Sequence, residues 1–281
     1  MTATAFVQPE NSTTVRSNTI TVSEAARRFG EPPAPTAPRV PEVPGATTER
    51  ITLQVGVAMR ELAVYRWRQG SGRPVALLAH GFGGSAAQLA AFVPGLLAAG
   101  FNVVAFDQPA HGFSPGRYAH LVEFSRNISA VARAFDARAV IAHSLGATAT
   151  LLAHARGLPL ERAVLIAPPG NVEHFATAFA DHVGLPREQL PALLTQVERE
   201  LGYPLHLLDV RNLLSIAEGA PAELLVMHDP ADAEVPYAHA RDLIEHWPSA
   251  RLQTLSGVGH RRVLRDQAAI ANAVAHITQV A

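Results

Sequence analysis

The chain contains no cysteine among its 281 residues. This absence excludes disulfide bonds, thiolate metal sites and a cysteine nucleophile, and it fits a reducing compartment. A charge excess is also lacking, because 23 basic residues stand against 24 acidic ones and the formal net charge is -1. The sequence has neither a basic stripe nor an acidic tail, so we do not expect nucleic acid as a partner.

Long apolar runs are missing as well. No segment reaches the roughly 18 to 20 uninterrupted apolar residues that a membrane-spanning helix needs. The N-terminal segment has no basic region followed by an apolar run, so we predict no signal peptide. We therefore expect a soluble, cytoplasmic protein with no membrane partner.

Prolines are concentrated near the N-terminus, in the segment from Glu31 to Gly45. Their density excludes a helix or a central strand and predicts an extended, polyproline-like arm. Just before it, Thr21 to Phe29 is predicted to form a short helix with Ser23 as its N-cap. We interpret residues 1–48 as a flexible arm and residues 49–281 as one globular domain.

The globular part alternates short strands with helix-length segments. Ile51–Val57 and Glu61–Trp67 alternate apolar and polar residues, which predicts an antiparallel pair. Almost wholly apolar runs follow, and these are typical of parallel strands that helices cover on both faces. They are Val75–Ala79, Val103–Phe106, Ala139–Ala142, Ala163–Ala167 and Glu223–Met227, with a last strand at Arg251–Leu255. Helix-length segments stand at Ala86–Ala99, His120–Phe135, Leu145–Arg156 and near Leu264–Thr278. We predict an α/β fold with a doubly wound, mostly parallel sheet.

The interval between Ala167 and Glu223 is too long for an ordinary connection. Its apolar residues recur at helical spacing, as in Phe175, Phe179 and Val183. We predict a helical cap inserted at about residues 169–221.

A serine stands at the junction of a predicted strand and a predicted helix. The strand Ala139–Ala142 runs through His143 into Ser144, and a helix begins at once. Such a turn strains its central residue, lifts the side chain out, and needs small neighbours such as Ala142 and Gly146. Ser144 is therefore a candidate nucleophile, with a helix N-cap as its alternative role.

A glycine-rich segment, residues 80–84, follows another predicted strand. Glycines let backbone amides approach and stabilise an oxyanion. The same segment satisfies a dinucleotide fingerprint through Gly81, Gly83 and Ala86, with Asp107 at the end of the next strand as a ribose ligand. On this segment alone, both interpretations stay open.

A serine nucleophile needs a base, and a histidine base needs a carboxylate that holds its tautomer. His260 lies in a glycine-rich loop after the last predicted strand and is the candidate base. Three acids follow the strand Glu223–Met227, namely Asp229, Asp232 and Glu234. A serine, then an acid, then a histidine is one of the chain orders in which catalytic triads occur.

Together these segments resemble the motifs of the α/β-hydrolase family over about residues 60–275. Residues 142–146 are similar to its nucleophile elbow G-x-S-x-G, with Ala142 in place of the first glycine. Residues 80–84 resemble its oxyanion loop. Residues 107–114 resemble its D-x-x-G-H-G-x-S turn, with Ala110 in place of a glycine.

The resemblance implies a triad of Ser144 as nucleophile, His260 as base and Asp232 as acid. Asp232 is favoured because residues 228–236 align with the family's pattern H-G-x-x-D-x-x-V-P. Asp229 occupies the glycine position of that pattern and is the close rival.

The resemblance also assigns the backbone amides of Phe82 and Leu145 as the oxyanion donors. His80 and His111 are then structural, the first orienting the oxyanion loop and the second holding a turn. The substrate pocket is expected to be lined by three side chains, which are His143, Phe175 and Phe179.

The implied activity is hydrolysis of an ester or related acyl bond of a small-molecule substrate, as in a carboxylesterase, through an acyl-enzyme and without cofactor or metal. A serine nucleophile argues against the family's dehalogenases and epoxide hydrolases, which use an aspartate. One alternative is a binding or scaffold protein that keeps the fold without turnover. The other, a dinucleotide-binding protein, leaves the elbow, the acid and the base unexplained.

Overall fold

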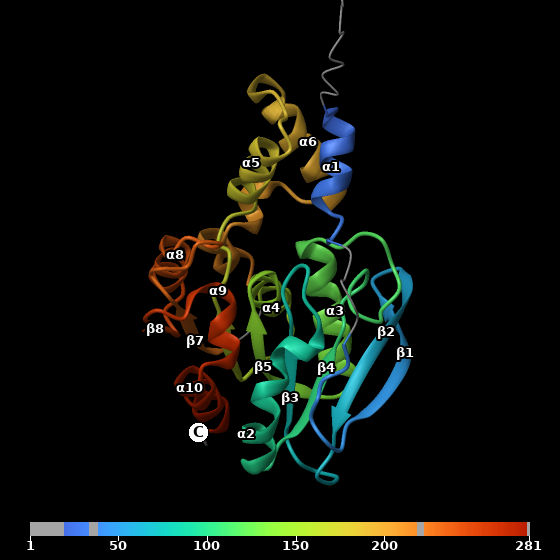
Figure 1. Cartoon of the computed structure of the whole chain (residues 1–281), viewed down its shortest axis with the longest axis vertical. Helices are drawn as coiled ribbons and strands as arrows, with labels where there is room; N and C mark the ends of the chain where they lie inside the picture. Colours follow the sequence, from blue (N-terminus) through green and yellow to red (C-terminus); the bar gives the residue numbers. More distant parts are fainter. Residues whose placement is uncertain (1–19, 34–38, 218–221, 280–281) are drawn as a thin grey trace, which may run out of the picture.

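The computed structural model describes residues 20–33, 39–217 and 222–279, which are built on one 8-stranded sheet (Figure 1). The strands lie in the order β1-β2-β4-β3-β5-β6-β7-β8. Their bounds are β1 Thr47–Val55, β2 Ala58–Trp67, β3 Val75–Ala79, β4 Asn102–Phe106, β5 Ala137–His143, β6 Arg162–Ile166, β7 Glu223–His228 and β8 Ala250–Thr254. β2 pairs antiparallel with β1 and with β4, and every other neighbouring pair is parallel. The prediction of a doubly wound, mostly parallel α/β sheet is confirmed.

The central strands are parallel because both of their faces are covered. β3 and β5 are buried along almost their whole length, whereas alternate residues of the edge strand β1 are exposed. The register pairs Ala79 of β3 with Ala142 of β5. The segments that follow these two alanines therefore leave the same edge of the sheet side by side, where open α/β sheets place their ligands.

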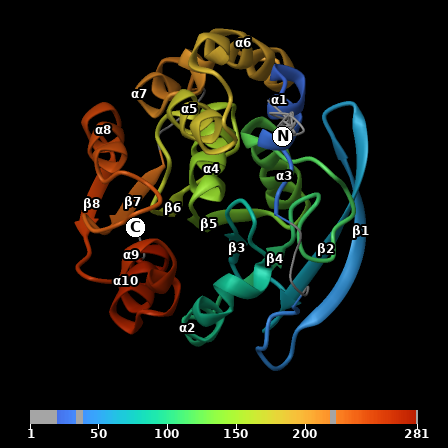
Figure 2. The same ribbon diagram turned by 45° about the horizontal axis from the view of Figure 1, so that its top comes forward.

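Helices pack against both faces of this sheet (Figure 2). Their bounds are α2 Val93–Ala98, α3 Leu121–Ala134, α4 Leu145–Ala155, α8 Ala238–His246 and α10 Gln267–Thr278. Phe124 of α3, Leu152 of α4 and Leu243 of α8 belong to the apolar core on one face. Leu96 of α2 and Ile270 of α10 belong to the core on the other face. The sheet thus supports two separate apolar layers.

Among the described helices around the sheet, the sequence analysis does not predict α8 or the short helix α9 (Gly259–Arg262). Helix α8 carries two histidines, an arginine, an aspartate and a glutamate among its nine residues, so its apolar stripe is narrow. The predicted helix at Ala86–Ala99 is divided into a 3-10 turn, Ala86–Phe92, and α2. Pro94 lies in the first turn of α2, where a proline is tolerated because that N–H has no helical partner.

The first helix, α1 (Val22–Phe29), packs against the rest of the chain. Its N-cap is Thr21, whose hydroxyl accepts from the Glu24 amide, and not the predicted Ser23, which lies inside the first turn. Ala25 and Ala26 are fully buried, so this part of the segment predicted as a flexible arm is docked. The rest of the predicted arm at residues 1–19 and 34–38 lies outside the described residues.

Helices α5 (Val172–His182), α6 (Leu190–Leu201) and α7 (Val210–Leu213) occupy the interval between β6 and β7. Figure 1 shows α5 and α6 standing beyond the sheet together with α1. Leu193 and Val197 of α6 belong to the same apolar cluster as the buried alanines of α1. The helical spacing of this interval thus forms helices, and its last residues, 218–221, lie outside the described part.

Among the described residues, no helix combines the length and the apolar character required to cross a membrane.

Candidate active site

Ser144 occupies a sharp turn between β5 and α4. Its backbone has φ 53 and ψ -128, a positive φ that residues with a side chain seldom adopt. The Ser144 amide donates to the Ile166 carbonyl at 2.8 Å, which fixes the turn against β6. Ser144 stands at the N-cap position of α4, but its side chain makes no capping hydrogen bond, so the alternative in which this side chain caps the helix is wrong. The strained turn holds the hydroxyl at the edge of the sheet, away from the backbone amides of α4.

Two glycines make room for this turn. A Cβ on Gly81 would lie 2.8 Å from the Cβ of Ser144, and a Cβ on Gly146 would collide with the carbonyl oxygen of His80. The segment 80–84 and the turn at Ser144 therefore touch through backbone and small side chains alone. Any larger residue at either position would push the two segments apart.

The structure brings Ser144, His260 and Asp232 together. His260 lies in the short helix α9 (Gly259–Arg262), and its Nε2 is 3.0 Å from the Oγ of Ser144. Its Nδ1 is 2.8 Å from the Oδ2 of Asp232. A carboxylate only accepts, so Nδ1 carries the proton and Nε2 presents a lone pair to the serine hydroxyl. This arrangement can remove a proton from the serine.

Asp232 is held as an anion beside His260. Its Oδ1 accepts the amides of Glu234 at 2.8 Å and Val235 at 2.9 Å, and its side chain is 1% exposed. Burial raises the pKa of this carboxyl, but the hydrogen bonds from His228, His260 and the two amides outweigh it and hold the pKa well below its ordinary range. The negative charge is therefore present throughout the neutral pH range.

His228 is a neighbour of this group to which the sequence analysis gives no role. Its Nε2 lies 3.3 Å from the Oδ2 of Asp232 and 3.1 Å from the carbonyl oxygen of Val235. Both partners are acceptors, so Nε2 carries the proton. Two imidazoles thus donate to one carboxylate oxygen. The signal in the sequence was the position of His228 at the end of a strand, four residues before Asp232.

The two rival acids face other partners. Asp229 accepts the Gly259 amide at 2.7 Å and the Ala231 amide at 2.9 Å. It therefore fixes the backbone before His260 and does not hydrogen-bond the ring. Glu234 forms a bidentate ion pair with Arg261, at 2.8 Å and 2.9 Å, and both side chains are exposed.

His80 and His111 hold the glycine-rich loop. His80 Nε2 accepts the Gln108 amide at 2.9 Å, and its Nδ1 lies 2.7 Å from the Gly81 carbonyl oxygen. His111 Nε2 accepts the Gly83 amide at 2.9 Å. Burial lowers the pKa of His80 to about 4 and that of His111 to about 3, so both rings are neutral at pH 7. These contacts support structural roles for both histidines.

The buried histidines predict a pH-dependent stability. Unfolding returns the pKa of His111 to about 6.5. Between this pH and about pH 3, the unfolded chain therefore binds a proton at His111 and the folded chain does not. Above pH 6.5 the titration of His111 therefore does not affect the free energy of unfolding, and from pH 6.5 towards pH 3 this free energy falls as the pH falls. We expect His111→Gln to reduce this slope between pH 6 and 4.5 by about 1 kcal/mol per pH unit in urea unfolding. The exposed His206→Gln is the control, and equal slopes for wild type and His111→Gln would contradict the assignment.

Asp107 is unavailable to a ribose. Its carboxylate is buried and accepts the Tyr65 hydroxyl at 2.9 Å, the Ala86 amide at 2.8 Å and the Phe113 amide at 2.9 Å. The dinucleotide interpretation requires this acid to face a bound ligand. The carboxylate instead ties β2 to the two loops that follow β3 and β4, which argues against that interpretation.

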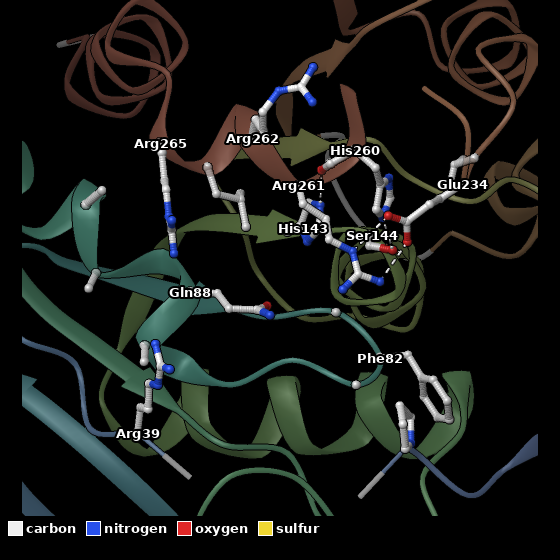
Figure 3. A pocket seen from close by; sticks show the side chains of 18 of the residues that line it. Arg39, Phe82, Gln88, His143, Ser144, Glu234, His260, Arg261, Arg262 and Arg265 are labelled. Atoms are coloured by element: carbon white, nitrogen blue, oxygen red, sulfur yellow. Dashed lines mark hydrogen bonds and ion pairs between the residues drawn. The ribbon is translucent and has the colours of Figure 1, made fainter. Parts of the chain in front are cut away.

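A cavity of about 820 Å³ opens over Ser144 (Figure 3). Of the predicted pocket residues, His143 and Phe175 line it, while Phe179 is not among its lining residues. The Phe179 ring packs against Phe29 of α1, with ring centroids 5.5 Å apart. Phe175 and Phe179 do lie one turn apart on the same helix, α5, as their spacing predicts. Of the two, Phe175 lines the cavity and Phe179 does not.

His143 contacts both the backbone and the ring of His260. Its Nε2 donates to the carbonyl oxygen of His260 at 2.9 Å, and the two ring centroids are 4.7 Å apart. Burial, followed by the charge of His260, lowers the pKa of His143 to about 3. The ring is neutral and fixes the backbone at His260.

Within the described ranges, no group of three or more histidine, aspartate or glutamate side chains is arranged to hold a metal ion.

The chain was compared with known proteins by sequence and by structure. The sequence model of the family described as serine aminopeptidase, S33, matches residues 70–203. A search of curated proteins finds no match to the chain. An esterase structure from Pyrococcus furiosus is 18% identical with a TM-score of 0.64, and covers 89% of this chain and 95% of its own. A putative hydrolase from Agrobacterium vitis is 20% identical with a TM-score of 0.62, and covers 82% of this chain and 96% of its own. The likeness to these solved structures shows that the chain has the α/β-hydrolase fold.

Proposed function

We propose that this protein is a serine hydrolase that cleaves an ester or related acyl bond of a small molecule. The observation that carries the proposal is the continuous chain of hydrogen bonds from Ser144 through His260 to Asp232, at 3.0 Å and 2.8 Å. The three residues lie in the segments that follow β5, β7 and β8, at the same edge of the sheet. Their order and geometry are those of a nucleophile, a base and an orienting acid.

In the proposed reaction, the Ser144 oxygen attacks the substrate carbonyl carbon while its proton moves to Nε2 of His260. The tetrahedral intermediate collapses, the bond to the leaving alcohol breaks, and that alcohol takes the proton from Nε2. A water molecule then attacks the acyl-enzyme and gives its proton to the same nitrogen. The acid is released, the proton returns to Ser144, and Asp232 stabilises the imidazolium in both steps.

We place the oxyanion between the amides of Phe82 and Leu145. Leu145 follows Ser144 at the first position of α4, and Phe82 follows Gly81, which packs directly on Ser144. Preorganised amides of this kind contribute a large share of the rate, because they need no reorganisation when charge develops. His80 and His111 would act through the loop that carries Phe82, as positioning residues.

We propose an ester bond, in preference to an amide bond, as the bond that is cleaved. The solved structure from Pyrococcus furiosus is named an esterase, whereas the matching family model is described as an aminopeptidase. A panel of p-nitrophenyl esters from acetate to decanoate, with labelling by a fluorophosphonate, tests the proposal. Turnover together with a single covalent adduct on Ser144 is expected. Folded protein that hydrolyses no ester and forms no adduct would contradict it and favour a binding protein without turnover.

Phe175 and Phe179 provide a matched test of substrate choice. Phe175 lines the cavity and Phe179 packs on α1, so Phe175→Ala should change the ratio of kcat/KM between short and long acyl chains by about tenfold. Phe179→Ala should leave that ratio unchanged and lower the free energy of unfolding by about 2 kcal/mol. Ester kinetics and urea unfolding of both variants measure these effects. A larger change in selectivity for Phe179→Ala would show that the cavity is lined differently.

A further inference from the structure

The cavity over Ser144 is more basic than the chain as a whole. Two glutamates, Glu42 and Glu234, line it, together with four arginines. Those arginines are Arg39, Arg261, Arg262 and Arg265. The whole chain has a net charge of -1, so positive charge is gathered at this cavity. Arg261 and Glu234 form an ion pair and cancel, which leaves three arginines against one glutamate.

Two of the remaining arginines face the cavity from its far end. In Figure 3, Arg39 and Arg265 extend toward each other, and Gln88 lies between this end and Ser144. Arg262 points away in the same view, and its Nη2 donates to the Gly257 carbonyl oxygen at 2.9 Å. The far end therefore presents two guanidinium groups, one from the segment before β1 and one from the turn after α9.

Neither guanidinium has a carboxylate partner within the described part of the chain, whereas ten other arginines there form ion pairs. Two like charges that face one space repel each other, and a bound anion relieves that repulsion. A guanidinium presents N–H donors in a planar fork that matches a carboxylate. The exposed Gln88 amide can add a neutral donor to such a group.

We propose that Arg39 and Arg265 bind a carboxylate of the substrate, so that the preferred substrate is an ester with a carboxylate remote from the scissile bond. The proposal rests on the proposed function, because it places the ester at Ser144 in the same cavity. A substrate with a free ammonium group would be repelled by the same two arginines. The site therefore disfavours the amino-terminal peptides that an aminopeptidase needs.

Matched ester pairs test this inference. On the acyl side, mono-p-nitrophenyl adipate and suberate are compared with neutral p-nitrophenyl esters of equal chain length, after correction for spontaneous hydrolysis. On the alcohol side, 4-acetoxybenzoate is compared with its methyl ester. At low ionic strength we expect kcat/KM to be about tenfold higher for the anionic member of at least one pair. The preference should shrink as salt is added, because both guanidinium groups are exposed.

Variants separate this site from general effects of charge. Arg265→Gln and Arg39→Gln should each reduce the preference to about threefold or less, and Arg265→Lys should keep part of it. Arg262→Gln is the control, since Arg262 lines the cavity but points away, and it should keep the full preference. A double Arg39→Gln, Arg265→Gln variant that retains the preference would overturn the proposal. Equal or lower kcat/KM for every anionic ester would overturn it too.

A binding measurement distinguishes failure of this inference from failure of the proposed function. Equilibrium dialysis with labelled adipate needs no turnover, and it should detect binding to the wild type and weaker binding, by about tenfold, to Arg265→Gln. Adipate binding without any ester hydrolysis would retain the anion site and remove the hydrolase. Neutral ester hydrolysis with no adipate binding and no anionic preference would retain the hydrolase and remove the anion site.

Discussion

Replacing Ser144 with alanine is expected to lower kcat for ester hydrolysis by a factor on the order of 10⁶ and to abolish labelling by a fluorophosphonate. The reason is that His260 Nε2 lies 3.0 Å from the Ser144 Oγ. Among the described residues, no other hydroxyl is hydrogen-bonded to this nitrogen. Alanine keeps the size that the turn against Gly81 and Gly146 tolerates, so the fold should persist. Steady-state kinetics and intact-protein mass spectrometry measure the two effects.

The control for this experiment is Ser256→Ala. Ser256 is exposed and lies in the loop just before α9, so it is close in sequence to His260 without hydrogen-bonding to it. Its replacement should leave labelling and kcat within about twofold of the wild type. If an adduct forms on another serine, or if Ser144→Ala retains turnover above about a hundredth of the wild type, Ser144 is not the nucleophile.

The sheet could be predicted from the sequence because its signal is local. Short apolar runs such as Val75–Ala79 and Ala163–Ala167 are buried on both faces, and they fall within one or two residues of the observed strands β3 and β6. The reactive groups of the candidate site follow the ends of strands, so locating a strand also locates the segment after it. Ser144 after β5 is the clearest example.

The docking of α1 could not be predicted in the same way. Its buried face consists of Ala25 and Ala26, which give a weak apolar signal. Its partners in α5 and α6 lie far along the chain, and no local pattern names them. The proline-rich segment that follows α1 favoured a free arm, and long-range packing overrides that tendency for the described residues.

Phe179 shows a second limit of the sequence. Helical spacing places Phe175 and Phe179 on one stripe of α5, but it does not say which surface each part of the stripe meets. The first meets the cavity and the second meets Phe29. The role of His228 is hidden for a related reason, since the contact with Asp232 depends on how the loop after β7 curls back.

The acid of the proposed triad can be distinguished from its rival by one pair of substitutions. Asp232→Asn is expected to lower kcat by a factor on the order of 10⁴, and Asp229→Asn by about tenfold or less. The Asp232 Oδ1 accepts the amides of Glu234 and Val235, so an asparagine oxygen should stay there. Its NH₂ group would then face the Nδ1 of His260, which must become an acceptor.

His260 would be forced into the tautomer that carries its proton on Nε2, and this nitrogen could no longer take the proton of Ser144. Asp229→Asn instead alters a contact with the Gly259 amide, which positions the backbone before the base and leaves its tautomer intact. Both variants are compared at one pH with circular dichroism as a check on folding. If Asp229→Asn proves the more damaging change, the acid is assigned three residues too far along the chain. Ser144 and His260 would keep their roles, because their mutual contact does not depend on which carboxylate orients the ring.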